Sequence, residues 1–355
     1  MEFLEFLVGV EKLGGIEMKM RTESDVLVFH DETNRAGEKK LSGHILLFVP
    51  EKLRLFYSSS LFGEEEVELN PLKMLFSKIE ELRRKFSAFH KFHFSEISGN
   101  KWTKIDEAGK QLVIFGVDAL RSKGSNIFEK PLRCKIAVIF FPTPTSDILA
   151  LYGGECRKEK IVRFNETILR MLLKGAVHYL YDEDNKVKIL KIITDGKPYH
   201  RKLSEDRIVW RLIEQSLSGN LKKYVEIPLD AEILHLASDH RKYSKDTENY
   251  VYANMLQLAD MLLGSVIQSC LKGIKWQKFS PDIDKKSIIA YPVKEMIDKR
   301  KRGKNFVHSG HYKSFAISEA CIANGEWQFE DIMTKEIVIN DDLNGMTLFD
   351  LEGMK

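Results

Sequence analysis

The stretch "DVLVFHDETNRAG", residues 25–37, changes abruptly from strand-forming apolar residues to acids. Its apolar run is followed at once by His30, Asp31 and Glu32. Either the strand simply ends here in a polar turn, or the strand holds a functional carboxylate in a fixed position. Because side chains alternate along a strand, the two acids should point to opposite faces. We predict that Asp31, which ends the strand directly, is the functional acid and that Glu32 is a turn residue.

The segments around this stretch predict a mixed α/β layer fold, because an initial strand meander is followed by strands alternating with helices. Period-two patterns predict strands, and three- and four-residue steps of apolar residues predict helices. Residues 88–98 alternate aromatic and polar residues, which favours an extended segment. The expected strands are 25–30, 41–50, 53–60, 134–142, 186–195 and 232–239, with a hairpin over 314–332. The expected helices are 71–86, 106–123, 159–181, 205–217 and 248–271.

Composition narrows the class of protein. The chain has 355 residues, 43% of them hydrophobic, and a formal net charge of +3. This permits a sizeable core, and the mild charge does not by itself indicate nucleic acid. The four cysteines form no metal-binding motif, acids stand where a signal peptide would be basic, and no apolar run reaches about 18 residues. We therefore expect a soluble, cytoplasmic protein with no membrane partner.

Near residue 275 the alternation of predicted strands and helices gives way to a basic loop, a hairpin and a tail, and we place a domain boundary there. Residues 1–274 are predicted to form the α/β domain, and residues 275–355 a small C-terminal accessory segment. This segment contains a basic loop, Lys299–Lys304, the predicted hairpin and a tail. We expect the accessory segment to contact the substrate or a protein partner.

Four carboxylates recur in similar settings, and together they predict a site. Asp31 and Asp195 each end a predicted strand, Glu96 lies in "HFSEIS", and Asp260 lies inside a strongly apolar helix. A carboxylate in such a helix must be paired, hydrogen-bonded or coordinated, because an isolated buried charge costs several kcal/mol. Each of the other three could instead be a surface or turn residue.

Carboxylate oxygens are the ligands that Mg²⁺ prefers, and Mn²⁺ accepts the same donors. Two such ions about 3.5–4 Å apart can activate water and stabilise the leaving oxygen in phosphodiester cleavage. The residues alone therefore indicate metal-dependent phosphoryl chemistry.

The ordered set "VFHDET", "FSEIS", "IITDGK" and "LHLASD…NMLQLADMLLG" resembles the domain-of-unknown-function 3800 family, whose fold is similar to ribonuclease H. The resemblance spans roughly residues 24–272, and "LQLAD" is its most specific piece. It implies an RNase H-like mixed sheet flanked by helices. It also implies that Asp31, Glu96, Asp195 and Asp260 are the metal-binding acids of a nuclease, and it suggests a place in antiviral defence.

The chain departs from the family pattern at two places. Thr33 and Asn34 stand where the family has a small Ser-Gly pair, which changes the turn but not the Asp31 carboxylate. Glu96 lies in an apparently extended segment, whereas the family pattern would place this acid on a helix. Asp239 is therefore a rival for one ligand position.

Several basic residues are candidates for substrate contacts. Lys197 closely follows Asp195, and Arg300 and Arg302 lie in the predicted basic loop, where they could contact a nucleic-acid backbone. His90 and His93 are expected at the surface, and His30 is expected to be packed in the core.

Together these observations predict a divalent-metal-dependent nuclease that uses Mg²⁺ or Mn²⁺ and binds DNA or RNA. The alternative is a non-catalytic nucleic-acid-binding or assembly protein that keeps the fold and uses its acids structurally. A phosphatase or nucleotide hydrolase would use the same acids, but the chain has no Gly-rich phosphate loop to support a nucleotide triphosphate.

Overall fold

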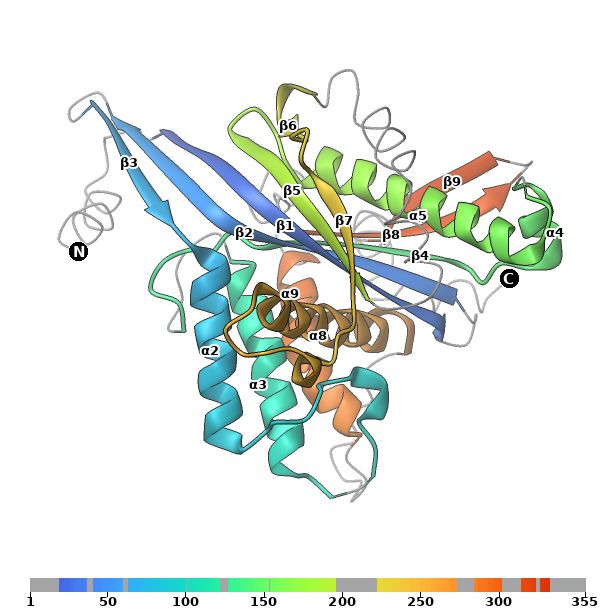
Figure 1. Ribbon diagram of the computed structural model, residues 1–355, viewed down its shortest axis with the longest axis horizontal. Coiled ribbons are helices and arrows are strands. Elements are labelled where there is room, and N and C mark those ends of the chain that lie inside the picture. The colour runs from blue at the N-terminus through green and yellow to red at the C-terminus, as the bar shows by residue number, and fades with distance from the viewer. Residues whose placement is uncertain are drawn as a thin grey trace.

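The computed structural model describes residues 19–36, 41–59, 63–99, 101–121, 127–152, 154–195, 222–272, 284–301, 314–323 and 326–332. These residues form a mixed α/β structure in which a nine-stranded sheet lies between two layers of helices (Figure 1). The predicted helix over 205–217 and the C-terminal tail lie outside the described residues. The predicted α/β class is confirmed.

The sheet has the strand order β6-β5-β1-β2-β4-β8-β9, and β3 and β7 pair with β2 and β5. β2 is antiparallel to both β1 and β4, whereas β5 is parallel to β1 and β8 is parallel to β4. The bounds are β1 (Lys19–Ala36), β2 (Leu41–Ser59), β3 (Gly63–Leu69), β4 (Lys135–Pro142), β5 (Asn185–Asp195), β6 (Val225–Glu226), β7 (Glu232–Leu236), β8 (Phe315–Ala323) and β9 (Glu326–Asp331).

β2 is one long strand where the sequence predicted two. Pro50 looked like a strand end, yet it lies within β2, opposite Val26 of β1. The register shifts at this point because Asp25 pairs with Lys52, so Glu51 forms a bulge. A bulge tolerates a proline, which lacks the N–H that a regular ladder needs. β1 likewise continues to Ala36, so the acids at 31 and 32 lie within the strand and not in a turn.

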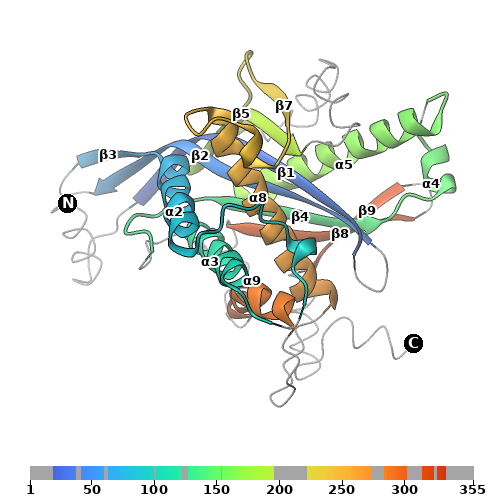
Figure 2. The same cartoon turned by 60° about the horizontal axis from the view of Figure 1, so that its bottom comes forward.

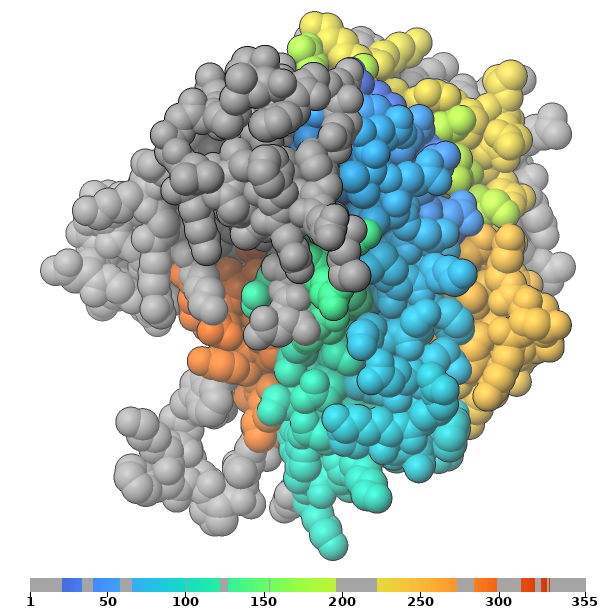
Figure 3. All heavy atoms as spheres, turned by 90° about the vertical axis from the view of Figure 1, so that its left-hand side faces the viewer, coloured from blue at the N-terminus to red at the C-terminus, as the bar shows by residue number. Residues whose placement is uncertain are grey.

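One face of the sheet is covered by α2 (Pro71–Phe86), α3 (Lys104–Ala119), α8 (Glu248–Ile267) and α9 (Lys285–Lys301), as Figures 1 and 2 show. α2 begins as predicted, with Pro71 in the first turn and the Asn70 side chain accepting a hydrogen bond from the peptide N–H of Lys73. α3 begins two residues before the predicted start, because Thr103 and Asp106 form a capping box. On the molecular surface, α2 and α3 lie next to each other (Figure 3).

α8 is the central helix of this layer. Every residue from Tyr252 to Ala259 is buried, because the helix is apolar around most of its circumference and packs against β1, α3 and α9. Its last turn passes into a π-helix over Gln268–Lys272. On the opposite face of the sheet lie α5 (Arg157–Leu180) and the short α4 (Ser146–Ala150) (Figure 1).

The described part of the C-terminal segment shares the sheet and the core with the preceding residues. The predicted hairpin is present as β8 and β9, and β8 hydrogen-bonds with β4 inside the sheet. α9 buries Ile289 and Val293 in the same core as α8. The buried Lys285 ammonium also lies 2.8 Å from the Asp106 carboxylate of α3. The domain boundary and the accessory role stay predictions.

Two further findings bear on the sequence predictions. The expected basic loop starts inside a helix, because α9 runs to Lys301; residues 302–304 lie outside the described residues. No helix within the described ranges is both long enough and apolar enough to span a bilayer.

Residues 88–98 do not form a strand. Phe92 and Phe94 are buried, as an alternating pattern requires, but their peptide N–H groups donate to side chains of α8 instead of to a neighbouring strand. The only regular structure between residues 88 and 98 is a 3₁₀ turn, Phe94–Glu96. The aromatic alternation therefore reflects burial against the helical layer and not sheet pairing.

Candidate functional site

The acids at 31 and 32 lie on opposite faces of the sheet, as predicted. Leu27 and Phe29 of β1 pack into the core on the α8 side, whereas Val26 and Val28 pack on the α5 side. Alternation along β1 therefore directs Asp31 toward α8 and Glu32 toward α5. Asp31 is buried, with 6% of its surface exposed.

Asp260 of α8 is the acid whose charge acts most strongly on Asp31. The two carboxyl groups are close enough to interact directly, although 229 residues separate them in the chain. Asp195, at the end of β5, adds a second negative charge close enough to act on Asp31. β5 runs parallel to β1 and pairs Thr194 with His30, so the two strands carry their acids to the same edge of the sheet.

The electrostatics of Asp31 follow from this arrangement. Burial raises the pKa of the Asp31 carboxyl well above its ordinary value, and the charges of Asp260 and Asp195 raise it further. Each effect disfavours the ionised form, because the charge loses its hydration and faces like charges. Three of the four predicted acids thus form one cluster, in which Asp31 is buried and Asp195 and Asp260 are partly exposed.

Asp260 is held by the segment that precedes Glu96. The peptide N–H of Phe94 donates to Asp260 Oδ2 at 2.7 Å, and His93 Nδ1 lies 2.9 Å from Asp260 Oδ1. The hydrogen bond to Asp260 raises the pKa of His93 above its ordinary value. The His93 side chain is one-third exposed, and that of Asp260 is 15% exposed.

The sequence placed His93 at the surface; it is one-third exposed, and it also contacts Asp260, which the sequence did not predict. The sequence contained one indication of this contact. His93 stands between Phe92 and Phe94, and burial of both phenylalanines holds the segment against the core. The partner of His93 could not be identified, because Asp260 lies 167 residues away along the chain.

Asp195 is held in a different way. Its Oδ1 accepts a hydrogen bond of 3.0 Å from the peptide N–H of Ser238, in the segment that follows β7. Ile193 packs in the α8-side core, so alternation also directs Asp195 to the face that carries Asp31. Asp195 is half-buried.

Glu96 and Asp239 occupy more peripheral positions. Glu96 is exposed in the 3₁₀ turn, and its charge acts on His93 and on Arg241. Asp239 forms an ion pair with Arg241 through both carboxylate oxygens, each 2.9 Å from a guanidinium nitrogen. This hydrogen bonding lowers the pKa of Asp239 to about 2. Glu96 stays a predicted ligand, and Asp239 has a structural partner.

Glu32 belongs to a separate buried cluster on the α5 side of the sheet. Its Oε2 lies 3.5 Å from His44 Nε2, and His44 Nδ1 lies 3.0 Å from His30 Nε2. All three side chains are buried. His30 is therefore packed in the core, as predicted, whereas Glu32 is a strand residue with a partner and not a turn residue.

The predicted substrate-binding residues are outside what the structure describes in detail. Lys197 and Arg302 lie outside the described residues, and Arg300 is in α9 with a side chain that is not described. In the part of the chain that is described, no group of three or more His, Cys, Asp or Glu side chains already has the arrangement of a metal site.

His240 adds a pH-dependent element next to the cluster. It is buried, and its Nδ1 lies 3.0 Å from Gln257 Nε2. Burial, followed by the charge of Arg83, lowers the pKa of His240 to about 4. An unfolded histidine has a pKa of about 6.5. Between these values only the unfolded chain binds the proton, so this residue makes the protein less stable as the pH falls from about 6.5 to about 4.

We predict that His240→Gln removes this contribution. The free energy of unfolding, measured with urea at pH 7, 6 and 5, should fall less steeply in the variant than in the wild type, by at most about 1.4 kcal/mol per pH unit. Carboxylates affect both proteins equally, so the difference isolates His240. Parallel curves for the two proteins would contradict the prediction.

Comparisons of the chain with protein-family models, with curated proteins and with solved structures found no match. Asp31, Asp195 and Asp260 lie on a strand, on a neighbouring parallel strand and on a buried helix.

Proposed function

We propose that this protein is a divalent-metal-dependent nuclease that hydrolyses phosphodiester bonds of DNA or RNA. The observation that carries the proposal is the burial of Asp31 beside Asp260, with Asp195 near enough for its charge to act on Asp31 as well. Proteins rarely bury like charges together, because each charge loses hydration and repels the others. A buried carboxyl whose pKa is strongly raised, with two further acids beside it, favours a functional site over a structural one.

The donor set suits a hard cation. Three carboxylates supply oxygen ligands, which Mg²⁺ and Mn²⁺ prefer, and a divalent cation would neutralise the repulsion that raises the pKa of Asp31. Asp31, Asp195 and Asp260 would hold the metal, with Glu96 as a further proposed ligand. When bound, such ions supply activation of water and stabilisation of the leaving oxygen.

The surrounding residues prepare the acids for this role. His93 and the peptide N–H of Phe94 orient the two oxygens of Asp260, and the peptide N–H of Ser238 orients Asp195. Oriented ligands do not have to be reorganised when a cation arrives. The proposed contacts to the nucleic-acid backbone are Lys197, Arg300 and Arg302.

The topology supports the proposed RNase H-like fold and the resemblance to the domain-of-unknown-function 3800 family. Three consecutive strands of the sheet, β1, β2 and β4, are antiparallel, and the chain then crosses over through α5 to β5, which is parallel to β1. The acids stand on the first strand, on this parallel strand and on a late helix, as the resemblance implies.

The test is metal-dependent cleavage. Purified protein should cut labelled single-stranded or double-stranded DNA or RNA with Mn²⁺ or Mg²⁺ and not with EDTA. Asp260→Asn should reduce cleavage by roughly a thousandfold, about 4 kcal/mol of transition-state stabilisation, while the protein stays folded by circular dichroism.

Two outcomes would reject the proposal. If Asp260→Asn cleaves as well as the wild type, the activity belongs to a contaminant. If the wild type binds nucleic acid but cleaves none with either metal, the non-catalytic alternative is correct.

A further inference from the structure

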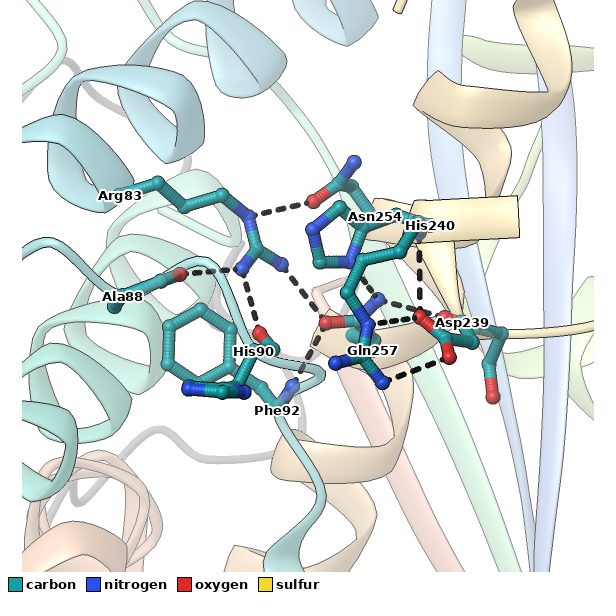
Figure 4. Close-up of polar contacts among 10 residues, drawn as sticks. Arg83, Ala88, His90, Phe92, Asp239, His240, Asn254 and Gln257 are labelled. Atoms are coloured by element: carbon teal, nitrogen blue, oxygen red, sulfur yellow. Dashed lines mark hydrogen bonds and ion pairs between the residues drawn. The ribbon is translucent and has the colours of Figure 1, made fainter. Parts of the chain in front are cut away.

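The side-chain amide of Gln257 joins two chain segments that are far apart in sequence (Figure 4). Its Oε1 accepts a hydrogen bond of 2.8 Å from the peptide N–H of Phe92. Its Nε2 donates to the carbonyl oxygen of Ser238 at 2.6 Å and lies 3.0 Å from His240 Nδ1. Gln257 is completely buried, so these contacts do not compete with water.

Each of these segments goes on to hold one acid of the candidate site. Phe92 is followed by His93 and Phe94, which bond to the two oxygens of Asp260. Ser238, whose carbonyl Gln257 binds, donates its own N–H to Asp195. The Gln257 amide therefore connects the segment that binds Asp260 to the segment that binds Asp195.

Arg83 of α2 secures the same amide from the other side. Its Nη2 donates to Gln257 Oε1 at 2.8 Å, its Nε donates to Asn254 Oδ1, and its Nη1 donates to the carbonyl oxygens of Ala88 and His90 (Figure 4). The guanidinium also lies over the ring of Phe92, 4.6 Å from its centre. Burial lowers the pKa of Arg83 to about 10, so it remains charged at neutral pH.

We propose that Gln257 is a positioning residue that sets the place of Asp260 relative to Asp195. Only a group with an acceptor and a donor can do this, because one segment offers an N–H and the other a carbonyl oxygen. A carboxylate would keep the first contact and lose the second. The effect of Gln257 on metal binding rests on the proposed function, whereas its effect on the two segments does not.

The chain provides a matched control one turn earlier in α8. Asn254 is equally buried, and it also accepts a hydrogen bond from Arg83. Its amide nitrogen donates within the helix, to the carbonyl oxygen of Tyr250. Asn254→Leu therefore removes a buried amide bonded to Arg83 without removing a contact to Phe92 or Ser238.

The experiment compares wild type, Gln257→Leu, Gln257→Glu and Asn254→Leu. Hydrogen exchange of the Phe94 and Ser238 amides is followed by NMR without metal, because these amides donate to Asp260 and Asp195. In Gln257→Leu both amides should exchange about tenfold faster or more, relative to amides in the middle of β2. In Gln257→Glu only Ser238 should do so, because the carboxylate still accepts from Phe92. Asn254→Leu should leave both within about threefold of the wild type.

Manganese affinity, measured by calorimetry with Mn²⁺ alone, is the second readout. Gln257→Leu should weaken it by about tenfold or more, and Asn254→Leu by less than about threefold. Unchanged exchange of Phe94 and Ser238 in both Gln257 variants, or equal effects in Asn254→Leu, would overturn the proposal. If the wild type binds no Mn²⁺, the proposed metal site fails, and the exchange data still decide the role of Gln257. If Gln257→Leu does not fold, the segment-specific effect of Gln257→Glu decides it.

Discussion

Asp31→Asn is expected to make the metal-free protein more stable at neutral pH and to reduce metal-dependent cleavage by roughly a thousandfold. Asp31 has a raised pKa in the folded protein. Ionisation of this residue therefore opposes folding once the pH exceeds 3.8, the ordinary pKa of an aspartate. Asparagine removes the charge and can still donate a hydrogen bond to Asp260. It cannot replace the carboxylate as a ligand for a hard cation.

The measurements are urea unfolding at pH 7 with EDTA and cleavage with Mn²⁺. Glu32→Gln is the matched control, because Glu32 is the adjacent acid on the same strand but faces α5 and pairs with His44. It should leave cleavage within about threefold of the wild type. A destabilised Asp31→Asn protein that still cleaves would show that Asp31 is a structural acid. An Asp31→Asn protein that unfolds would show the same.

Gly264→Ala is expected to destabilise the protein by about 2 kcal/mol and to displace the segment that holds Asp260. A Cβ on Gly264 would lie 2.1 Å from Cγ of Phe94 and 2.5 Å from its Cβ. Rotation of the ring cannot relieve a contact so close to the backbone, so the peptide of Phe94 must move. That peptide donates the hydrogen bond to Asp260, and cleavage should therefore fall together with stability.

The control is Gly175→Ala in α5, where the new Cβ would have no atom within 4 Å. It should stabilise the protein by about 0.5–1 kcal/mol, because alanine favours the helix over glycine. Gly116→Ala should fall between them, since its nearest contacts, at 3.0 Å, are the ends of leucine side chains that can shift. Urea unfolding of the three variants provides the ranking. Equal stability of Gly264→Ala and Gly175→Ala would contradict the prediction.

Much of the fold was readable from local patterns. The bounds of α2 follow from the Asn-Pro start and the apolar period, and the hydrophobicity of α8 predicted its burial. The errors occurred where long-range packing overrides a local signal. Pro50 was accommodated by a bulge, and residues 88–98 were held by α8 and not by a strand.

The sequence predicted only those site residues that have a local signal. Asp260 stood out because a carboxylate in an apolar helix needs a partner, and Asp31 and Asp195 stood out at the ends of apolar runs. His93 and the peptide N–H groups of Phe94 and Ser238 could not be found, because a backbone donor has no sequence signature. Their roles depend on which acid each segment meets.

The sequence by itself determined that Asp31 and Glu32 lie on opposite faces of β1, because alternation along a strand is a local property. It also determined that α8 is buried and that Asp260 must be satisfied there. Only the tertiary structure decided that Asp31 meets Asp260, that His93 supports it, and that Gln257 joins its support to that of Asp195. These contacts span up to 229 residues, and they arise when the packing of α8 against β1 brings the segments together.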